Sequence, residues 1–215
     1  MNVTVKSKVE VPELIEKRRA QIIKAAIELF GKRGYHVTTI RDIAKRANVS
    51  IGLIYQYVSD KEDVLFLALI EVLDSYQRGI PAAITDIEEP LARFCGAVRA
   101  YCEVNDQKGD ATVLAYRETK SLRKDRRDLI KRKELETNRL IEACINDCIK
   151  AGLFEKVDVE LFTYQIVMFS HAWALKAWRF RRLMTLDQYV RRGLRLMLGP
   201  VLTKRGERVF STLKP

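Results

Sequence analysis

The chain has 215 residues, of which 47% are hydrophobic and 31% are charged, a balance typical of a globular protein. Its net charge of +11 favours an anionic partner such as nucleic acid, an acidic membrane surface or a phosphorylated ligand, although a protein can be basic without one. The N-terminus has no apolar run of signal-peptide length, and the longest uncharged stretch, residues 161–175, is short for a membrane span. We therefore expect a cytoplasmic protein with no membrane partner.

The four cysteines do not have the spacing of a metal site. Cys95 and Cys102 are seven residues apart and Cys144 and Cys148 are four apart, within helical patterns. Disulfides at those spacings fit regular helix geometry poorly, so buried, reduced thiols are the favoured interpretation over redox sensing or metal binding. No metal or cofactor is expected.

Helical periodicity begins at Pro12 and ends at Gly34. After a segment with three helix starts, the pattern continues to about Arg78 and is broken by the sequence GIP. Further helices are predicted over residues 90–104, 110–122, 124–151, 158–181 and 185–199, and the last fifteen residues resemble a tail. The sequence thus predicts an all-α protein with an N-terminal domain at 12–79, a larger helical domain at 80–200 and a tail at 201–215.

The three helix starts lie in TTIRDIAKRANVSIGLIYQYVSDKEDVL, residues 38–65. Thr39 with Asp42 can cap the first helix, Ser50 the second, and Ser59 with Glu62 the third. The middle helix has only about seven residues and is unstable alone, so it must pack through Ile54 and Val58. Between the first two helices, Asn48 can adopt the left-handed conformation that the turn needs. The unit is a helix-turn-helix, whose second helix can enter the DNA major groove.

With the preceding AAIELFGKRGYHVTT, this segment resembles the DNA-binding signature of the tetracycline-repressor (TetR) family of bacterial transcriptional regulators, over residues 16–76. Three positions depart from the family pattern: Asn48 for Gly, Val58 for an aromatic residue, and Leu53 for a small or hydroxyl residue. The last makes the operator sequence harder to infer.

The resemblance implies a homodimer that binds double-stranded DNA, with a C-terminal domain that binds a small-molecule effector and usually releases the DNA. Arg41 could reach a guanine edge or a phosphate, Leu53 a thymine methyl, and the later positions phosphates. The alternative for Tyr55 is core packing, and for Gln56 simple solvation. By position in the motif, the implied DNA contacts are Thr39, Arg41, Ser50, Gly52, Leu53, Tyr55, Gln56, Tyr57 and Lys61.

The predicted helix over 158–181 is apolar on nearly every face, and the last helix places Leu186, Tyr189, Val190, Leu194 and Met197 on one side. We expect these two helices to form a four-helix interface with their symmetry mates.

The effector is expected to be an apolar molecule with an anionic end, and an acyl-CoA is the best candidate. Large side chains on the helix from Asp158 can line a pocket, and Tyr116 precedes a run, residues 117–133, with nine basic and three acidic residues. The alternative interpretation of that basic run is a solvated helix junction that binds no ligand. The alternatives are a hydrophobic drug or aromatic metabolite, or an architectural DNA binder without a ligand. The candidate ligand-binding residues are Tyr116, Met168, His171, Trp173 and Trp178.

An enzyme is not expected. The chain has only two histidines, His36 and His171, and contains no hydrolase, metalloprotease or phosphate-loop motif. A catalytic pair of a cysteine with His171 is conceivable, but nothing else in the sequence supports it.

Overall fold

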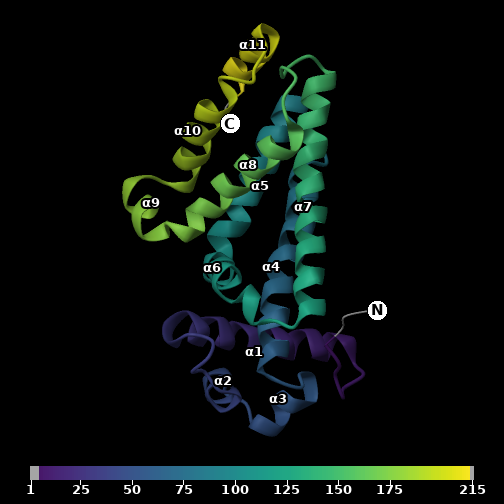
Figure 1. The fold of residues 1–215 in the computed structure, drawn as a ribbon, viewed down its shortest axis with the longest axis vertical. Helices are drawn as coiled ribbons and strands as arrows, with labels where there is room; N and C mark the ends of the chain where they lie inside the picture. The colour runs from purple at the N-terminus through teal and green to yellow at the C-terminus, as the bar shows by residue number, and fades with distance from the viewer. Residues whose placement is uncertain (1–4, 214–215) are drawn as a thin grey trace. The chain divides into compact units, whose positions relative to one another are not determined.

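A computed structural model of the chain describes residues 5–213, and these residues form eleven α-helices and no β-strand (Figure 1). Within the same residues, no helix is long and apolar enough to cross a membrane. The all-α prediction is confirmed. The helices are α1 (Pro12–Arg33), α2 (Ile40–Ala47), α3 (Ile51–Tyr57), α4 (Lys61–Ile84), α5 (Pro90–Gln107), α6 (Gly109–Glu118), α7 (Lys124–Lys150), α8 (Val159–Leu175), α9 (Ala177–Leu183), α10 (Leu186–Leu198) and α11 (Lys204–Thr212), with a short 3₁₀ helix, η1 (Thr119–Ser121).

The chain divides into two compact units that are each discontinuous in sequence. Unit 1 contains Met1–Val72 and Asp110–Arg132, and unit 2 contains Leu73–Gly109 and Lys133–Pro215. The predicted domain boundary at residue 79 lies inside α4, and the domain limits stay a prediction.

Unit 1 is built on α1, which packs against both α2 and α3. Ile22 of α1, Ile43 of α2 and Ile54 of α3 are almost completely buried. Burying a side chain of this size contributes about 1.5–3 kcal/mol, enough for three such contacts to hold helices of seven and eight residues that would not persist alone.

Unit 2 is built on α5, which packs against α8, α10 and α11. Phe94 and Val98 of α5, Ile166 of α8 and Leu194 of α10 are fully buried. Every face of α5 except the one bearing Arg93 and its neighbours is covered, so the helix acts as the core element of the unit.

Helix α4 does not end at Gly79, as the sequence predicted, but continues through Pro81 to Ile84. Ile80 is fully buried, and a Cβ at Gly79 would lie 3.4 Å from Cγ2 of Val104 on α5. The packing of this turn therefore outweighs the backbone hydrogen bond that proline cannot donate.

The predicted single helix over 158–181 is two helices. The break is at Lys176, whose backbone has φ −118° and ψ 26°. No glycine or proline marks it. After the break, Phe180 of α9 lies 6.3 Å from the ring of Trp173, nearly parallel to it, so aromatic contacts within unit 2 hold the changed direction.

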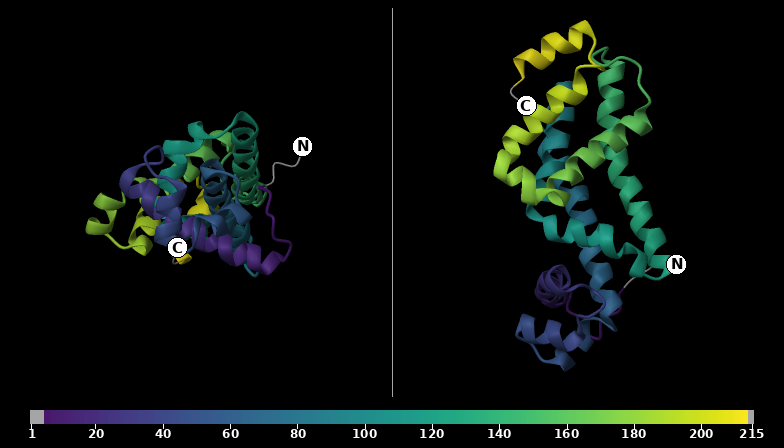
Figure 2. Two further views of the ribbon diagram at one scale, coloured as in Figure 1. Left: turned by 90° about the horizontal axis from the view of Figure 1, so that it is seen from below. Right: turned by 60° about the vertical axis from the view of Figure 1, so that its left-hand side comes forward.

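The expected tail contains α11, which lies across one end of unit 2 instead of extending away (Figure 2). Thr203 caps the helix, and Gly206 lies so close to the backbone of Leu153 that a Cβ there would be 2.1 Å from the Leu153 carbonyl oxygen. The small residue is what allows this approach. Residues 214–215 lie outside the described part of the chain.

Candidate DNA-recognition site and effector groove

The turn between α2 and α3 has the predicted geometry. Thr39 and Asp42 form a complete capping box at the start of α2, and the Ser50 hydroxyl accepts a hydrogen bond from the Leu53 amide at the start of α3. Asn48, with φ 53° and ψ 49°, is the one non-glycine among the described residues with positive φ. The caps at Thr39 and Ser50 and the left-handed turn at Asn48 are thus confirmed in the roles assigned from sequence.

The start of α4 is capped one residue later than predicted. The Asp60 carboxylate accepts from the Asp63 amide at 2.7 Å, and the Asp63 carboxylate accepts from the Ser59 amide at 2.6 Å. Asp60 and Asp63 have the same three-residue spacing as the predicted pair, Ser59 and Glu62, shifted by one residue.

Helix α3 presents one exposed face. Ile51, Gly52, Tyr55 and Gln56 are exposed and Leu53 is half-buried, whereas Ile54 and Val58 are buried, as expected for core residues. Thr39, Arg41 and Ser50 are exposed at the helix starts beside it.

Tyr57 does not match its predicted role as a phosphate contact. It is only 2% exposed, while Tyr55 is 44% exposed. Tyr57 lies on the side of α3 that faces α1, where the Arg19 guanidinium donates to its carbonyl oxygen at 3.0 and 3.1 Å. We therefore assign Tyr57 to the core of unit 1 and leave it out of the DNA-contact set.

Lys61 also differs from its predicted role. Its ammonium donates to the carbonyl oxygens of Tyr35 (2.8 Å), His36 (3.0 Å) and Thr38 (2.8 Å), and it lies 4.5 Å from the centroid of the Tyr35 ring. An ammonium has three donors, so all of them are used. Lys61 thus holds the segment between α1 and α2 to α4, and the expectation that it contacts a phosphate does not fit this geometry.

Sequence reasoning missed Arg126, which it placed within a solvated basic run. Arg126 is 5% exposed and pairs with the carboxylate of Asp63, which is 2% exposed. Burial alone would raise the pKa of Asp63, but the Ser59 amide and the Arg126 guanidinium outweigh it and hold the pKa below its usual value. Arg123 adds a contact to Glu62 at 3.3 Å. The start of α7 is thereby joined to the first turn of α4.

The five predicted ligand-binding residues do not all belong to one unit. Tyr116 belongs to unit 1 and is half exposed, and Met168 (47%) and Trp178 (70%) are exposed on unit 2. His171 is buried, with its ring 5.5 Å from that of Tyr101, and burial lowers its pKa to about 4, so it is neutral at pH 7.

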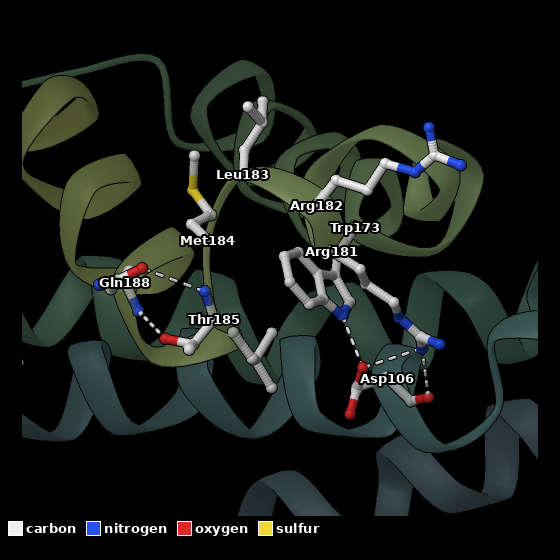
Figure 3. A pocket seen from close by; sticks show the side chains of 9 residues that line it. Asp106, Trp173, Arg181, Arg182, Leu183, Met184, Thr185 and Gln188 are labelled. Atoms are coloured by element: carbon white, nitrogen blue, oxygen red, sulfur yellow. Dashed lines mark hydrogen bonds and ion pairs between the residues drawn. The ribbon is translucent and has the colours of Figure 1, made fainter.

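Only Trp173 of that set lines a groove of unit 2 that has a volume of about 670 Å³ and is formed by α5, α8, α9 and α10 (Figure 3). Its indole Nε1 donates to Oδ1 of Asp106 at 2.8 Å, and the same oxygen accepts from Nη2 of Arg181 at 2.9 Å. Figure 3 shows the Arg182 side chain directed away from this cluster. The other lining residues are Arg182, Leu183, Met184, Thr185, Leu186 and Gln188.

All four cysteines are buried and unpaired. Burial raises the pKa of Cys95 and of Cys102 to about 12, so both are thiols at neutral pH. No cluster of His, Cys, Asp and Glu among residues 5–213 could hold a metal ion.

A capped helix-turn-helix with an exposed recognition helix, joined to a second helical unit, defines the class of helix-turn-helix transcriptional regulators. The chain belongs to the TetR family: the family model for bacterial regulatory proteins of the tetR family matches residues 22–68, and that for a tetracyclin repressor-like C-terminal domain matches residues 88–174. The resemblance recognised in the sequence is confirmed. Members of this family bind DNA, act as dimers and carry a ligand-binding domain.

Three known proteins illustrate the similarity. The HTH-type transcriptional regulator HbdR of Aromatoleum sp. (strain CIB) is 53% identical over 204 residues, which cover 95% of this chain and 89% of that protein. The structure of the ketosteroid transcriptional regulator KstR2 of Mycobacterium tuberculosis matches with a TM-score of 0.74 at 23% identity, covering 94% of this chain and all of that one. The fatty acid degradation regulator FadR from Bacillus halodurans matches with a TM-score of 0.72 at 21% identity, covering 89% and 97%. At these identities the two structures show the fold alone.

Proposed function

We propose that the chain is a dimeric repressor that binds a near-palindromic operator and is released by a small apolar or amphipathic effector. The observation that carries the proposal is the exposed face of α3. The helix is fixed by the cap at its start and by its buried face, so its exposed face can be inserted into a major groove. A dimer carries two such helices, which is the physical reason for a palindromic site.

The proposed DNA contacts divide by chemistry. Arg41 can donate to a guanine edge or a phosphate, Leu53 can contact a thymine methyl, and Tyr55 and Gln56 can donate to phosphates. Gly52 allows close backbone approach. The Ser50 hydroxyl accepts from the Leu53 amide and can still donate its hydrogen to a phosphate. The amide and the hydroxyl of Thr39 both donate to the Asp42 carboxylate, so a phosphate contact by Thr39 would replace one of those bonds.

Duplex selection from a random pool, followed by binding measurements, tests this function. Arg41→Ala should weaken binding to the selected duplex by about 5- to 150-fold, which corresponds to about 1–3 kcal/mol for a base contact, and should affect a random duplex less. Arg117→Ala is the matched control, because Arg117 is an exposed arginine of α6 in the same unit. Failure of the wild-type protein to enrich any sequence, or an equal loss for both variants on both duplexes, would contradict the proposed recognition.

The proposed dimer surface differs from the sequence-based one. Tyr189, Val190 and Leu194 of α10 are buried within the protomer, because α10 packs against α5, and so are unavailable to a partner. The exposed apolar residues of the same two helices are Leu161, Tyr164 and Met168 of α8, at helical spacing i, i+3 and i+7, and Leu196 of α10, which is 80% exposed. We place the four-helix interface on these residues.

Sedimentation at micromolar concentration checks the dimer surface. Tyr164→Glu and Leu196→Glu should each shift the protein toward monomer, since each buries a charge in an apolar contact. Leu135→Glu, at another exposed apolar position of unit 2, should not. A monomeric wild-type protein would rule out the interface.

For the effector, an acyl-CoA remains our best candidate. The groove in Figure 3 combines apolar lining from Trp173, Leu183 and Met184 with two guanidinium groups, Arg181 and Arg182, which suits an apolar chain ending in an anion. Arg181 already pairs with Asp106, so we assign the anionic end to Arg182, whose side chain points outward at the rim of the groove and would meet a group that extends beyond it.

A DNA-release assay across acyl-CoAs, free fatty and aromatic acids, and neutral aromatics separates the candidates. The proposal is supported if acyl-CoAs release the DNA and Arg182→Gln weakens this release. Arg179→Gln, at an exposed position of α9, is the control and should not weaken it. Release by neutral aromatics alone would favour a hydrophobic drug or aromatic metabolite. No release by any compound would favour an architectural DNA binder.

A further inference from the structure

The segment before α1 is bound to the recognition helix. The Lys8 amide donates to the Gln56 carbonyl oxygen at 2.8 Å, and the Ser7 hydroxyl donates to the same oxygen at 3.1 Å. The Arg19 guanidinium joins the two chains a second time, since its Nη2 donates to the carbonyl oxygens of Val5 at 2.6 Å and of Tyr57 at 3.0 Å. These bonds satisfy carbonyl groups at the C-terminal end of α3 that have no partner within a helix.

Exposure alternates along this non-helical segment. Val5, Ser7 and Val9 are partly buried, whereas Lys6, Lys8 and Glu10 are exposed. This exposure places the first three side chains against unit 1 and the last three toward its outside. The segment is therefore a fixed strip along the end of α3, with a cationic outer side at Lys6 and Lys8.

The two lysines are placed to meet an anion beside the recognition helix. Because they are two residues apart, their Cα atoms are at most about 7 Å from each other. Neither forms an ion pair with the residues that the structure describes. Gln56, whose carbonyl anchors the segment, has an exposed side chain on α3 itself. When α3 lies in a groove, whatever borders its C-terminal end faces the sugar–phosphate backbone at the groove's edge.

We propose that residues 5–8 form a DNA-contacting arm, in which Lys6 and Lys8 bind phosphates at the edge of each half-site. The proposal rests on the DNA-binding function above and extends the contact set to a segment outside the helix-turn-helix. The arm contributes charge and not base recognition, because its outer side carries ammonium groups, which bind phosphates as point charges.

Salt dependence of DNA binding is the direct test. Each lost phosphate contact reduces the slope of log K against log salt by about 0.9, and a dimer has four such lysines, so Lys6→Gln/Lys8→Gln should reduce the slope by about 3–4 on both a selected and a random duplex. Lys150→Gln/Lys156→Gln removes the same charge from exposed positions of unit 2 and should leave the slope unchanged. Lys6→Arg/Lys8→Arg should keep the wild-type slope.

The outcomes separate the arm from the function it rests on. A wild-type slope in Lys6→Gln/Lys8→Gln, or a reduction no larger than that of the unit 2 control, would overturn the arm and leave DNA binding intact. A reduction confined to the selected duplex would also overturn it, because it would indicate base recognition. If the wild-type protein binds no duplex at any salt concentration, both the arm and the proposed function fail. Thermal melts of each variant establish that the fold is retained.

Discussion

Replacing Lys61 with methionine would distinguish a structural clamp from a DNA contact. Methionine keeps an unbranched apolar side chain but removes the ammonium that donates to the carbonyl oxygens of Tyr35, His36 and Thr38. Burial lowers the pKa of Lys61 below its usual value, in agreement with an ammonium partly withdrawn from water.

The expected loss follows from these contacts. A hydrogen bond to a charged group contributes about 1.5–3 kcal/mol when buried, but Lys61 is only half-buried and water can replace part of each bond. Its position over the Tyr35 ring adds about 0.5–1 kcal/mol. We therefore expect the free energy of unfolding to fall by about 2 kcal/mol in Lys61→Met, which corresponds to roughly 4–8 °C in Tm for a chain of this length.

Thermal melts and the salt dependence of duplex binding should be measured on the same samples. Lys131→Met, at an exposed position of α7 in unit 1, is the matched control and should shift Tm by less than about 2 °C. The clamp predicts a lower Tm with an unchanged salt slope in Lys61→Met. An unchanged Tm together with a slope reduced by about 2 for the dimer would refute it and restore the phosphate contact expected from sequence.

Three further changes are informative. Burial lowers the pKa of His171 to about 4, below the unfolded value of about 6.5, so the wild-type protein loses stability as the pH falls from 6.5 to 4. In denaturant melts over this pH range, His171→Gln should lose less free energy of unfolding than the wild type, by up to about 3 kcal/mol. Parallel plots of stability against pH for the two proteins would contradict this. Gly206→Ala should release α11, seen as lost amide protection over residues 204–212, while Gly199→Ala should not. Asn48→Ala should lower the free energy of unfolding, measured by denaturant melts, by about 1 kcal/mol and Asn48→Gly should not lower it. An equal loss in both variants would count against the left-handed turn.

The helix-turn-helix could be predicted because its determinants are local. A cap such as Thr39 acts on an amide three residues away, and Asn48 acts on its own backbone, so both are visible in a window of ten residues. The exposed face of α3 followed from the same local pattern, since Ile54 and Val58 had to be buried to hold so short a helix.

The remaining features depend on contacts between distant parts of the chain. The role of Lys61 requires carbonyl groups more than twenty residues earlier, and the burial of Arg126 requires an acidic partner 63 residues earlier. The continuation of α4 through Pro81 depends on the packing of Ile80 in unit 2. No window of sequence contains both partners, so a basic run and a helix-breaking residue were interpreted from composition alone.

The pairing of Asp63 with Arg126 also sets an order of events during synthesis. At about 5–20 residues per second, the ribosome adds the 63 residues between them in roughly 3–13 seconds. Throughout that interval α1 to α3 have been synthesised, and α4 is completed within it, yet the Asp63 carboxylate that later becomes buried lacks its counter-ion. In a nascent chain, the unit that contains the recognition helix would therefore be less stable until the beginning of α7 has left the ribosome. A newly made regulator would reach the full stability of its DNA-binding unit only late in translation.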